Sequence, residues 1–376
     1  MGVDLARKNL LHDKLRFLIT VSGVAFAVTL VFVQVGLFMG LLDNASITIR
    51  HLNADLWVTS KNTPNIDFAQ TFPETVVQRV RSIPGVQRAD NLIVWFMTMS
   101  LPSGAKEGTL VYALEDFERW SFPWNVVEGD LTDLRRGNYL FLDSSAEKRF
   151  GKFQVGEYRE MIGRRLKIIG RTQDALSFST TPIVFLDYRR AQGMSPDELA
   201  GNTTYIVVKL APGADVEAVR REIKSRLPHN DVHTGAEWAA QSRRYWIEST
   251  GLGLNLAMTI FLGCLVGVVV VAQTLYTSTM EHIKEFGTVK AIGGSNLDIY
   301  KILGEQAAIS AIVGFALGGV MSWLLRPAMA SIDLKLIISP AFAATVGVGT
   351  LVLCLAAAVI SFRKVARIDP ALVFRG

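Results

Sequence analysis

The chain has 376 residues, of which 50 % are hydrophobic, and its formal net charge at pH 7 is +5. This length and composition predict an integral membrane protein of one or two modules. Its two cysteines, Cys264 and Cys354, both fall in apolar runs, which excludes a disulfide framework or a cysteine-based metal site in the polar part of the chain.

Four runs without a charged residue organise the chain: Phe17–Leu42, Ser249–Met280, Gln306–Leu325 and Leu336–Phe362. A run of about 18 or more uncharged, apolar residues is long enough to cross a bilayer as a helix. We therefore expect transmembrane helices at 17–42, 251–280, 303–325 and 336–362, a domain of 206 residues at 43–248, and a short outer loop at 326–335.

Basic residues predict the orientation of these helices. The segment 1–16, the 281–305 loop and the 363–376 tail hold 11 Lys and Arg residues together, whereas the 326–335 loop holds 2. Because short cytoplasmic loops carry the excess of Lys and Arg, both termini and the 281–305 loop are predicted to be cytoplasmic. The 43–248 domain is then outside. No charged residue interrupts the four runs, which argues against an ion-coupled carrier and an aqueous pore.

The first 16 residues alternate basic and apolar side chains and predict a cytoplasmic amphipathic helix in the inner membrane interface. A cleaved signal peptide is the competing interpretation, but the 26-residue apolar run that follows is too long for one. Within that run we expect Gln34 to form a hydrogen bond between helices.

Inside the 43–248 domain, one order of elements occurs twice. ADLWVTS (54–60) predicts a strand, PETVVQRVRSI (73–83) a short helix, and residues 86–99 include a second strand. TTYIVVKL (203–210), residues 214–227 and DVHT (231–234) repeat strand, helix and strand. This repetition predicts a duplicated βαβ subdomain with halves at about 50–109 and 201–237, and a β-rich insert at about 110–200.

The segment 238–250 leads into the second apolar run without a helix breaker before Gly251. We therefore predict that it continues the second transmembrane helix outward as a stalk. Its aromatic residues Trp238, Tyr245 and Trp246 are expected near the membrane interface or against a partner.

The segment 281–295 is a polar element between the second and third apolar runs. Its charged residues at helical spacing alternate with an apolar stripe that contains Phe286, and Gly293 ends the predicted helix. These charged residues are Glu281, Lys284, Glu285 and Lys290. A connector on the membrane surface and a helix that docks on a partner both fit this pattern. Further on, Gly314-x-x-x-Gly318 permits close helix packing, within the chain or in a dimer.

Several catalytic motifs do not occur in the sequence. It has no G-x-x-x-x-G-K-[ST] phosphate loop, no H-E-x-x-H and no G-x-S-x-G. His229 and His233 lie four residues apart, but Pro228 and the Asn-Asp pair predict a loop with solvated side chains instead of a metal site. We therefore expect no enzyme activity, no cofactor and no metal in this chain.

The stretch TMEHIKEFGTVKAIGGSNLDI resembles the cytoplasmic coupling segment of FtsX/MacB-type ABC transporter permeases. His282 and Phe286 replace the arginine and isoleucine common in that family. The residues in register with the family are Glu281, Lys284, Glu285, Gly287, Lys290, Ala291 and Gly293. The N-terminal segment, through Ala6, Asn9, Lys14 and Arg16, and the tail, through Asp369, Pro370 and Arg375, are similar to the same family. The run GVAFAVTLVFVQVG most resembles its DevC-type subfamily.

This resemblance implies an α+β membrane protein with four transmembrane helices and a large mixed α/β periplasmic domain, built from a duplicated porter-like βαβ subdomain and a β-rich insert. It also implies a homodimer in the bacterial inner membrane. Two copies of a separate cytoplasmic ATPase would bind ATP and dock on the coupling helix at 281–295. A periplasmic adaptor (membrane fusion protein) and a TolC-like outer-membrane channel would complete the export system. Nucleic acid is not among the implied partners.

Within that family, the first interpretation is an exporter that transmits ATP-driven motion to its periplasmic domain, with lipid, glycolipid, peptide or drug cargo. The second is an FtsX-like signal relay that activates a periplasmic cell-wall hydrolase. The 206-residue domain favours export, because such relays tend to have a smaller outer domain. A membrane enzyme is the third interpretation, and the sequence offers no catalytic constellation for it.

Overall fold

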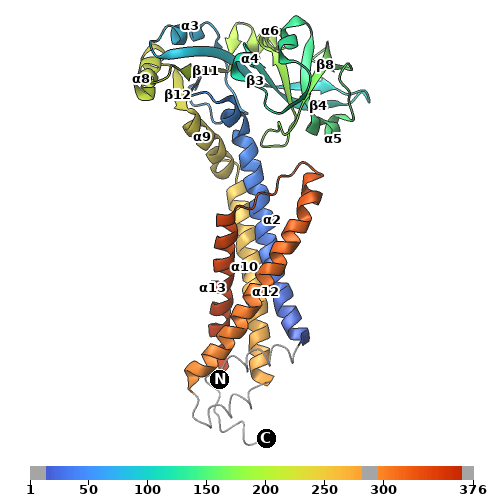
Figure 1. Ribbon diagram of the computed structural model, residues 1–376, viewed down its shortest axis with the longest axis vertical. Helices are drawn as coiled ribbons and strands as arrows, with labels where there is room; N and C mark the ends of the chain where they lie inside the picture. The colour runs from blue at the N-terminus through green and yellow to red at the C-terminus, as the bar shows by residue number, and fades with distance from the viewer. Residues whose placement is uncertain (1–13, 282–294, 366–376) are drawn as a thin grey trace, which may run out of the picture. The chain divides into compact units, whose positions relative to one another are not determined.

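The computed structural model describes residues 14–281 and 295–365, and the chain divides into two compact units (Figure 1). The helical unit comprises Met1–Met39 and Leu254–Gly376, and the α/β unit comprises Gly40–Gly253. Helix α2 (Lys14–Leu52) contributes residues to both units, since the boundary falls between residues 39 and 40. Each unit has a hydrophobic core of its own.

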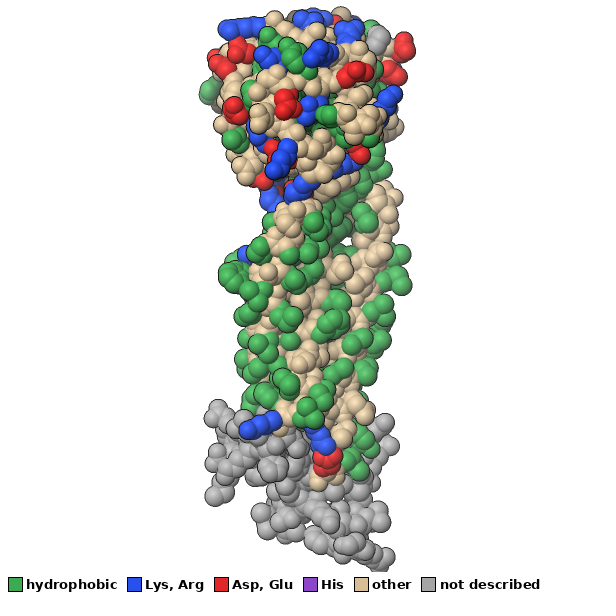
Figure 2. Space-filling model, turned by 90° about the vertical axis from the view of Figure 1, so that its right-hand side faces the viewer, with side chains coloured by type: hydrophobic (Ala, Val, Ile, Leu, Met, Phe, Trp, Pro, Cys, Tyr) green, Lys and Arg blue, Asp and Glu red, His purple; other side chains and the backbone are tan. Residues whose placement is uncertain are grey.

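The helical unit consists of long apolar helices. They are the first part of α2, α10 (Leu252–Glu281), α12 (Asn296–Ala330) and α13 (Pro340–Val365). All four are long and apolar enough to cross a membrane. Large hydrophobic side chains remain on their outer faces, including Phe261 (66 % exposed) and Trp323 (64 % exposed). Figure 2 shows such side chains along this unit. An apolar outer face is unfavourable in water but not in lipid, so these faces fit a lipid environment.

Helices α2 and α12 extend beyond the charge-free runs that predict them. Helix α2 continues to Leu52, ten residues past the expected end at 42, because the α/β unit buries the polar side chains of Asn44, Ser46 and Thr48. Helix α12 begins at Asn296 instead of 303 and therefore includes Lys301 and Glu305 in its first three turns. The position of the charged residues shows only where an apolar run ends, whereas the hydrogen-bonded helix can continue past that point.

The α/β unit contains a ten-stranded sheet with the order β12-β1-β11-β3-β4-β9-β6-β8-β5, and β7 pairs with both β3 and β8. The strands of one end are β1 (Leu56–Ser60), β3 (Val86–Ser100), β11 (Tyr205–Leu210) and β12 (Asn230–Thr234). Their neighbours are all antiparallel, and β11 lies between β1 and β3 while β1 lies between β11 and β12. This interleaving of two βαβ units confirms the predicted duplication.

Helices α3 (Val76–Arg81) and α8 (Val216–Arg226) cover this end of the sheet. Their buried residues, Val77 and Val80 on α3 and Val219 and Ile223 on α8, pack with apolar residues of the four strands. Asp215 begins α8 as its N-cap, because its carboxylate accepts hydrogen bonds from the N–H groups of the first turn.

The insert supplies the rest of the sheet. Its strands are β4 (Lys106–Leu114), β5 (Val126–Glu128), β6 (Tyr139–Asp143), β7 (Tyr158–Met161), β8 (Arg164–Thr172) and β9 (Ile183–Asp187). Its short helical turns are α4 (Phe117–Trp120), η1 (Leu131–Arg136), η2 (Ser144–Ala146), α5 (Glu147–Phe150), α6 (Tyr188–Gln192) and α7 (Pro196–Leu199). A two-residue ladder joins β2 (Phe72–Pro73) to β10 (Asn202–Thr203). The insert is thus β-rich, as expected.

The insert and the duplicated subdomain share one sheet. Strand β3 is 15 residues long; it pairs with β11 up to Leu92 and with β4 from Leu92 onward. The β structure of the insert therefore begins within β3, before the boundary near 110 that the sequence predicts. A single long strand gives both parts hydrogen-bonded neighbours and leaves no free sheet edge between them.

Candidate functional site

The stalk helix is α9 (Gly235–Glu248), and its first turn is fixed to the end of β12. Thr234 and Glu237 form a capping box, with hydrogen bonds of 3.2 Å and 3.0 Å between each side chain and the other residue's N–H. One turn later, Trp238 is fully buried, and its ring lies 5.9 Å from that of Tyr205 and 5.1 Å from that of His233. Burial lowers the pKa of His233. Trp238 anchors the helix in the core.

The stalk does not continue the second transmembrane helix, which corrects the sequence-based prediction. Helix α9 ends at Glu248, helix α10 begins at Leu252, and Gly251 between them has a φ of +71°. A residue in this left-handed conformation ends helices, and glycine adopts it without steric cost. The aromatic residues of α9 contact the α/β unit itself.

A loop that we call the strap, residues 61–71 between β1 and β2, lies against α9. The amide of Gln241 donates to the carbonyl of Thr63 at 3.0 Å, and the N–H of Ile66 donates to the hydroxyl of Ser242 at 3.3 Å. The hydroxyl of Tyr205 donates to the Asn65 and Ile66 carbonyls at 3.1 Å and 3.0 Å. These bonds pair three carbonyls and one N–H group of the strap with side chains of α9 and β11.

A second loop, residues 173–182 between β8 and β9, reaches α9 from the insert. The ring of Phe178 stacks on that of Trp246 with 3.9 Å between centroids and 10° between planes. On the strap, Phe68 lies 5.9 Å from Trp246 and 5.8 Å from Tyr245. Trp246 therefore contacts an aromatic residue of the strap and one of the insert. We call this group of Phe68, Phe178 and Trp246 the aromatic clamp.

The two loops of the clamp meet at a buried carboxylate. Asp67 is only 5 % exposed, and burial raises its pKa from 3.8 to about 7, although a hydrogen bond from the backbone of Phe178 lowers it. Burial also raises the pKa of the nearby Tyr112 and Tyr205 hydroxyls, and the charge of Asp67 adds to both shifts. Neither loop has a repeating hydrophobic pattern, so sequence reasoning missed the strap, Asp67 and Phe178.

The end of α2 belongs to the same site. The guanidinium of Arg243 on α9 donates to the hydroxyl of Ser46 on α2 at 3.0 Å. Ile47, Ile49 and Trp238 share one hydrophobic core. The segments by which the chain enters and leaves the α/β unit are thus held together inside it.

Of the residues predicted to couple the chain to an ATPase, Glu281 is the one that the structure describes. It ends α10 and forms an ion pair with Arg16 of α2, within the helical unit. The other predicted coupling residues lie outside the described residues: Lys284, Glu285, Phe286, Gly287, Lys290 and Gly293. The tail at 366–376 also lies outside them.

The glycines Gly314 and Gly318 of α12 lie against α2 of the same chain. A Cβ at Gly314 would come 2.5 Å from Val24 Cγ1, and a Cβ at Gly318 would come 2.8 Å from Val28 Cβ. Both glycines therefore permit close packing within the chain, and a role in a dimer stays a prediction.

Gln34 is exposed on α2 and forms no hydrogen bond among the described residues, so its hydrogen bond between helices stays a prediction. It follows Phe32 by two positions, about 200° around the helix from the face that packs in the core.

Residues 14–281 and 295–365 contain no group of three His, Cys, Asp or Glu side chains that could hold a metal ion. His233 belongs to strand β12, as the DVHT segment predicts, and it packs on Trp238. In this site one helix, α9, contacts two loops through aromatic rings and a small number of hydrogen bonds.

Comparison with known proteins gives two family models that together span most of the chain. The MacB-like periplasmic core domain matches residues 17–226, and the FtsX-like permease C-terminal matches residues 257–370. An uncharacterized ABC transporter permease of Mycobacterium tuberculosis is 24 % identical over 94 % of this chain and 93 % of its own length. One of Methanocaldococcus jannaschii is 20 % identical over 89 % and 86 %. The periplasmic region of MacB from Actinobacillus actinomycetemcomitans covers 54 % of this chain and 96 % of that structure, at 13 % identity and a TM-score of 0.38.

Proposed function

Because the chain belongs to the FtsX/MacB family of ABC transporter permeases, we propose that it transmits ATP-driven motion from a separate cytoplasmic ATPase to its extracellular domain. The sequence lacks a phosphate loop, so ATP binding and hydrolysis belong to the partner subunit, and this chain itself has no enzyme activity and needs no cofactor. The segment 281–295 would receive the motion as a coupling helix.

The aromatic clamp is the observation that supports this proposal. The chain leaves the α/β unit through α9, and the last turns of α9 contact both the strap and the insert. A pull on residues 249–253 therefore acts directly on Trp246, where both parts of the domain hold the helix. Motion of α9 would change the position of the insert relative to the duplicated subdomain.

The proposed assembly is a homodimer with two ATPase subunits in the bacterial inner membrane, both termini in the cytoplasm. Eleven Lys and Arg residues in the cytoplasmic segments against two in the 326–335 loop support this orientation. A periplasmic adaptor and a TolC-like channel would continue the route outward, as in DevC-type systems, for a lipid, glycolipid, peptide or drug. Co-purification of an adaptor and a channel supports export, and that of a cell-wall hydrolase supports the relay.

The variant Trp246→Ala tests the role of the clamp. Loss of the stacked ring should uncouple export from ATP hydrolysis, so the ATPase rate of the reconstituted complex stays near wild type while export falls. Ile247→Ala is the matched control, because Ile247 is the next residue of α9 and is 40 % exposed. Normal export by Trp246→Ala at wild-type abundance would remove the clamp from the mechanism.

A further inference from the structure

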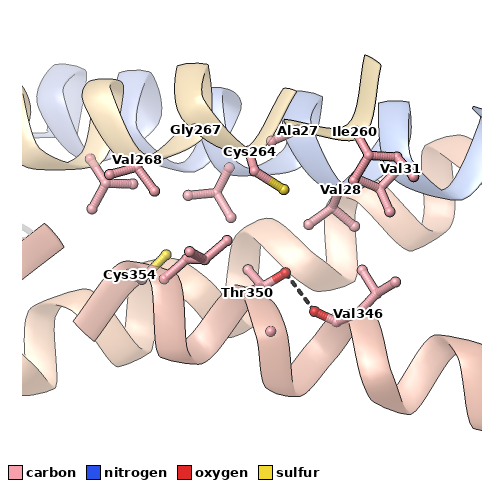
Figure 3. Close-up of a pocket in the computed structure, with 14 residues that line it drawn as sticks. Ala27, Val28, Val31, Ile260, Cys264, Gly267, Val268, Val346, Thr350 and Cys354 are labelled. Carbon is pink, nitrogen blue, oxygen red and sulfur yellow. Dashed lines mark hydrogen bonds between the residues drawn. The ribbon is translucent and has the colours of Figure 1, made fainter. Parts of the chain in front are cut away.

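The helical unit contains a cavity of about 120 Å³ between α2, α10 and α13 (Figure 3). Its lining is hydrophobic apart from the hydroxyl of Thr350, which already donates to the carbonyl of Val346 at 2.8 Å. The lining residues thus present no polar group that lacks a partner. Because water needs two or more polar partners to occupy a site, the cavity suits an apolar guest.

Two glycines in the lining differ in what surrounds them. A Cβ at Gly267 of α10 would come 3.0 Å from the Cβ of Ala27, so this glycine permits α2 and α10 to pack closely. A Cβ at Gly349 of α13 would meet no atom within 4 Å. Glycine destabilises a helix relative to alanine, and no close contact at Gly349 offsets that cost. The missing side chain instead leaves space in the cavity.

The size of the cavity selects its occupant. One turn of a helix, about 10 Å across and about 5.4 Å long, occupies on the order of 400 Å³. This is several times the volume of the cavity, which is about 120 Å³. A transmembrane helix of a second copy is therefore too thick to enter it. An unbranched hydrocarbon chain is thinner and needs no hydrogen bond. The lipid around the four helices supplies such chains at high concentration.

We propose that this cavity binds one acyl chain of a bilayer phospholipid. Within a membrane an acyl chain gains little free energy by leaving other lipid tails. Close packing against α10 and α13 therefore provides the binding free energy. The bound chain would fill the space that the helices leave beside Gly349. The site does not depend on the proposed coupling to an ATPase.

Photo-crosslinking of the full chain in lipid nanodiscs tests the proposal. The probe is a phosphatidylethanolamine with a diazirine in one acyl chain, and adducts are located by peptide mass spectrometry. Adducts are expected on the lining stretches of both α10 and α13, which contain Cys264 and Cys354. The variant Gly349→Leu should fill the cavity and reduce these adducts several-fold.

Gly319→Leu on α12 is the control, since a Cβ there also meets no atom within 4 Å and Gly319 does not line the cavity. It should leave the adducts unchanged. Equal labelling of wild type and Gly349→Leu would place the lipid on the outer surface and overturn the proposal. Absence of wild-type adducts on either α10 or α13 would also overturn it, whether or not the variant folds. Formation of a disulfide between the Cys264 residues of two wild-type copies under oxidising conditions would also overturn the proposal, because a second copy would then occupy the cavity.

Discussion

The buried carboxylate of Asp67 predicts a pH dependence of stability that one substitution isolates. Burial raises the pKa of Asp67 from 3.8 to about 7, so the folded chain keeps a proton that the unfolded chain releases near pH 3.8. The stability that protonated Asp67 contributes is therefore complete below pH 3.8, decreases as the pH rises to about 7, and is lost above that pH. The variant Asp67→Asn has no proton to lose at this position.

The size of the effect follows from the shift. At about 1.4 kcal/mol per pKa unit, a change from 3.8 to about 7 corresponds to about 4 kcal/mol over the full range. Between pH 5 and pH 8, the free energy of unfolding of the wild type should fall relative to Asp67→Asn by about 3 kcal/mol. For a domain of this size, that is a relative shift in midpoint of about 5–10 °C.

Thermal unfolding of the full chain, followed by tryptophan fluorescence, measures this difference. Six of the seven tryptophans lie between residues 40 and 253, so the signal reports mainly on the α/β unit. Asp133→Asn is the control, because its carboxylate is exposed in an ion pair with Arg136. A difference in midpoint between wild type and Asp67→Asn that stays constant from pH 5 to 8 would refute the reasoning.

Three further predictions test the proposed topology and coupling. The purified chain should hydrolyse no ATP until a separate ATP-binding subunit is added, and hydrolysis that does not depend on that subunit's catalytic glutamate would contradict this. Cysteines placed at Ser103 and Ser195 should react with an impermeant thiol reagent when only the outer membrane is permeable, and one at Ser295 only after the inner membrane is opened; the reverse pattern would overturn the orientation. Phe286→Ala should uncouple export, because truncating an aromatic residue at a docking interface costs about 2 kcal/mol or more. Glu285→Lys should do so only if that carboxylate meets a basic partner, and normal export in both variants would make the segment a surface connector.

The sequence predicts the parts of the fold that arise from strong periodic signals. Long uncharged runs mark the four apolar helices, and the repeated order of strand, helix and strand marks the duplicated subdomain. The extension of α2 to Leu52 was not predictable from the same signals. Asn44, Ser46 and Thr48 are typical of a surface, and they continue the helix because the folded α/β unit buries them.

The candidate site depended on contacts between distant segments, which no local pattern reports. Phe68 and Phe178 are 110 residues apart in sequence, and both rings lie against that of Trp246. The end of the stalk was different, because Gly251 is visible in the sequence as a helix terminator. The prediction of a continuous stalk was wrong because the apolar residues on both sides of Gly251 also fit a single helix.

The order in which the α9 contacts break follows from their strengths. Removing a buried tryptophan such as Trp238 from a core costs about 3–5 kcal/mol, whereas a stacked pair such as Phe178 and Trp246 contributes about 0.5–1.5 kcal/mol beyond its buried area. A pull on the end of α9 should therefore open the aromatic clamp while Trp238 and the capping box still hold the first turns. Hydrogen exchange during ATP turnover should then accelerate in residues 61–71 and 173–182 and stay slow in β12. Faster exchange in β12 at the same time would mean that the whole helix leaves the domain.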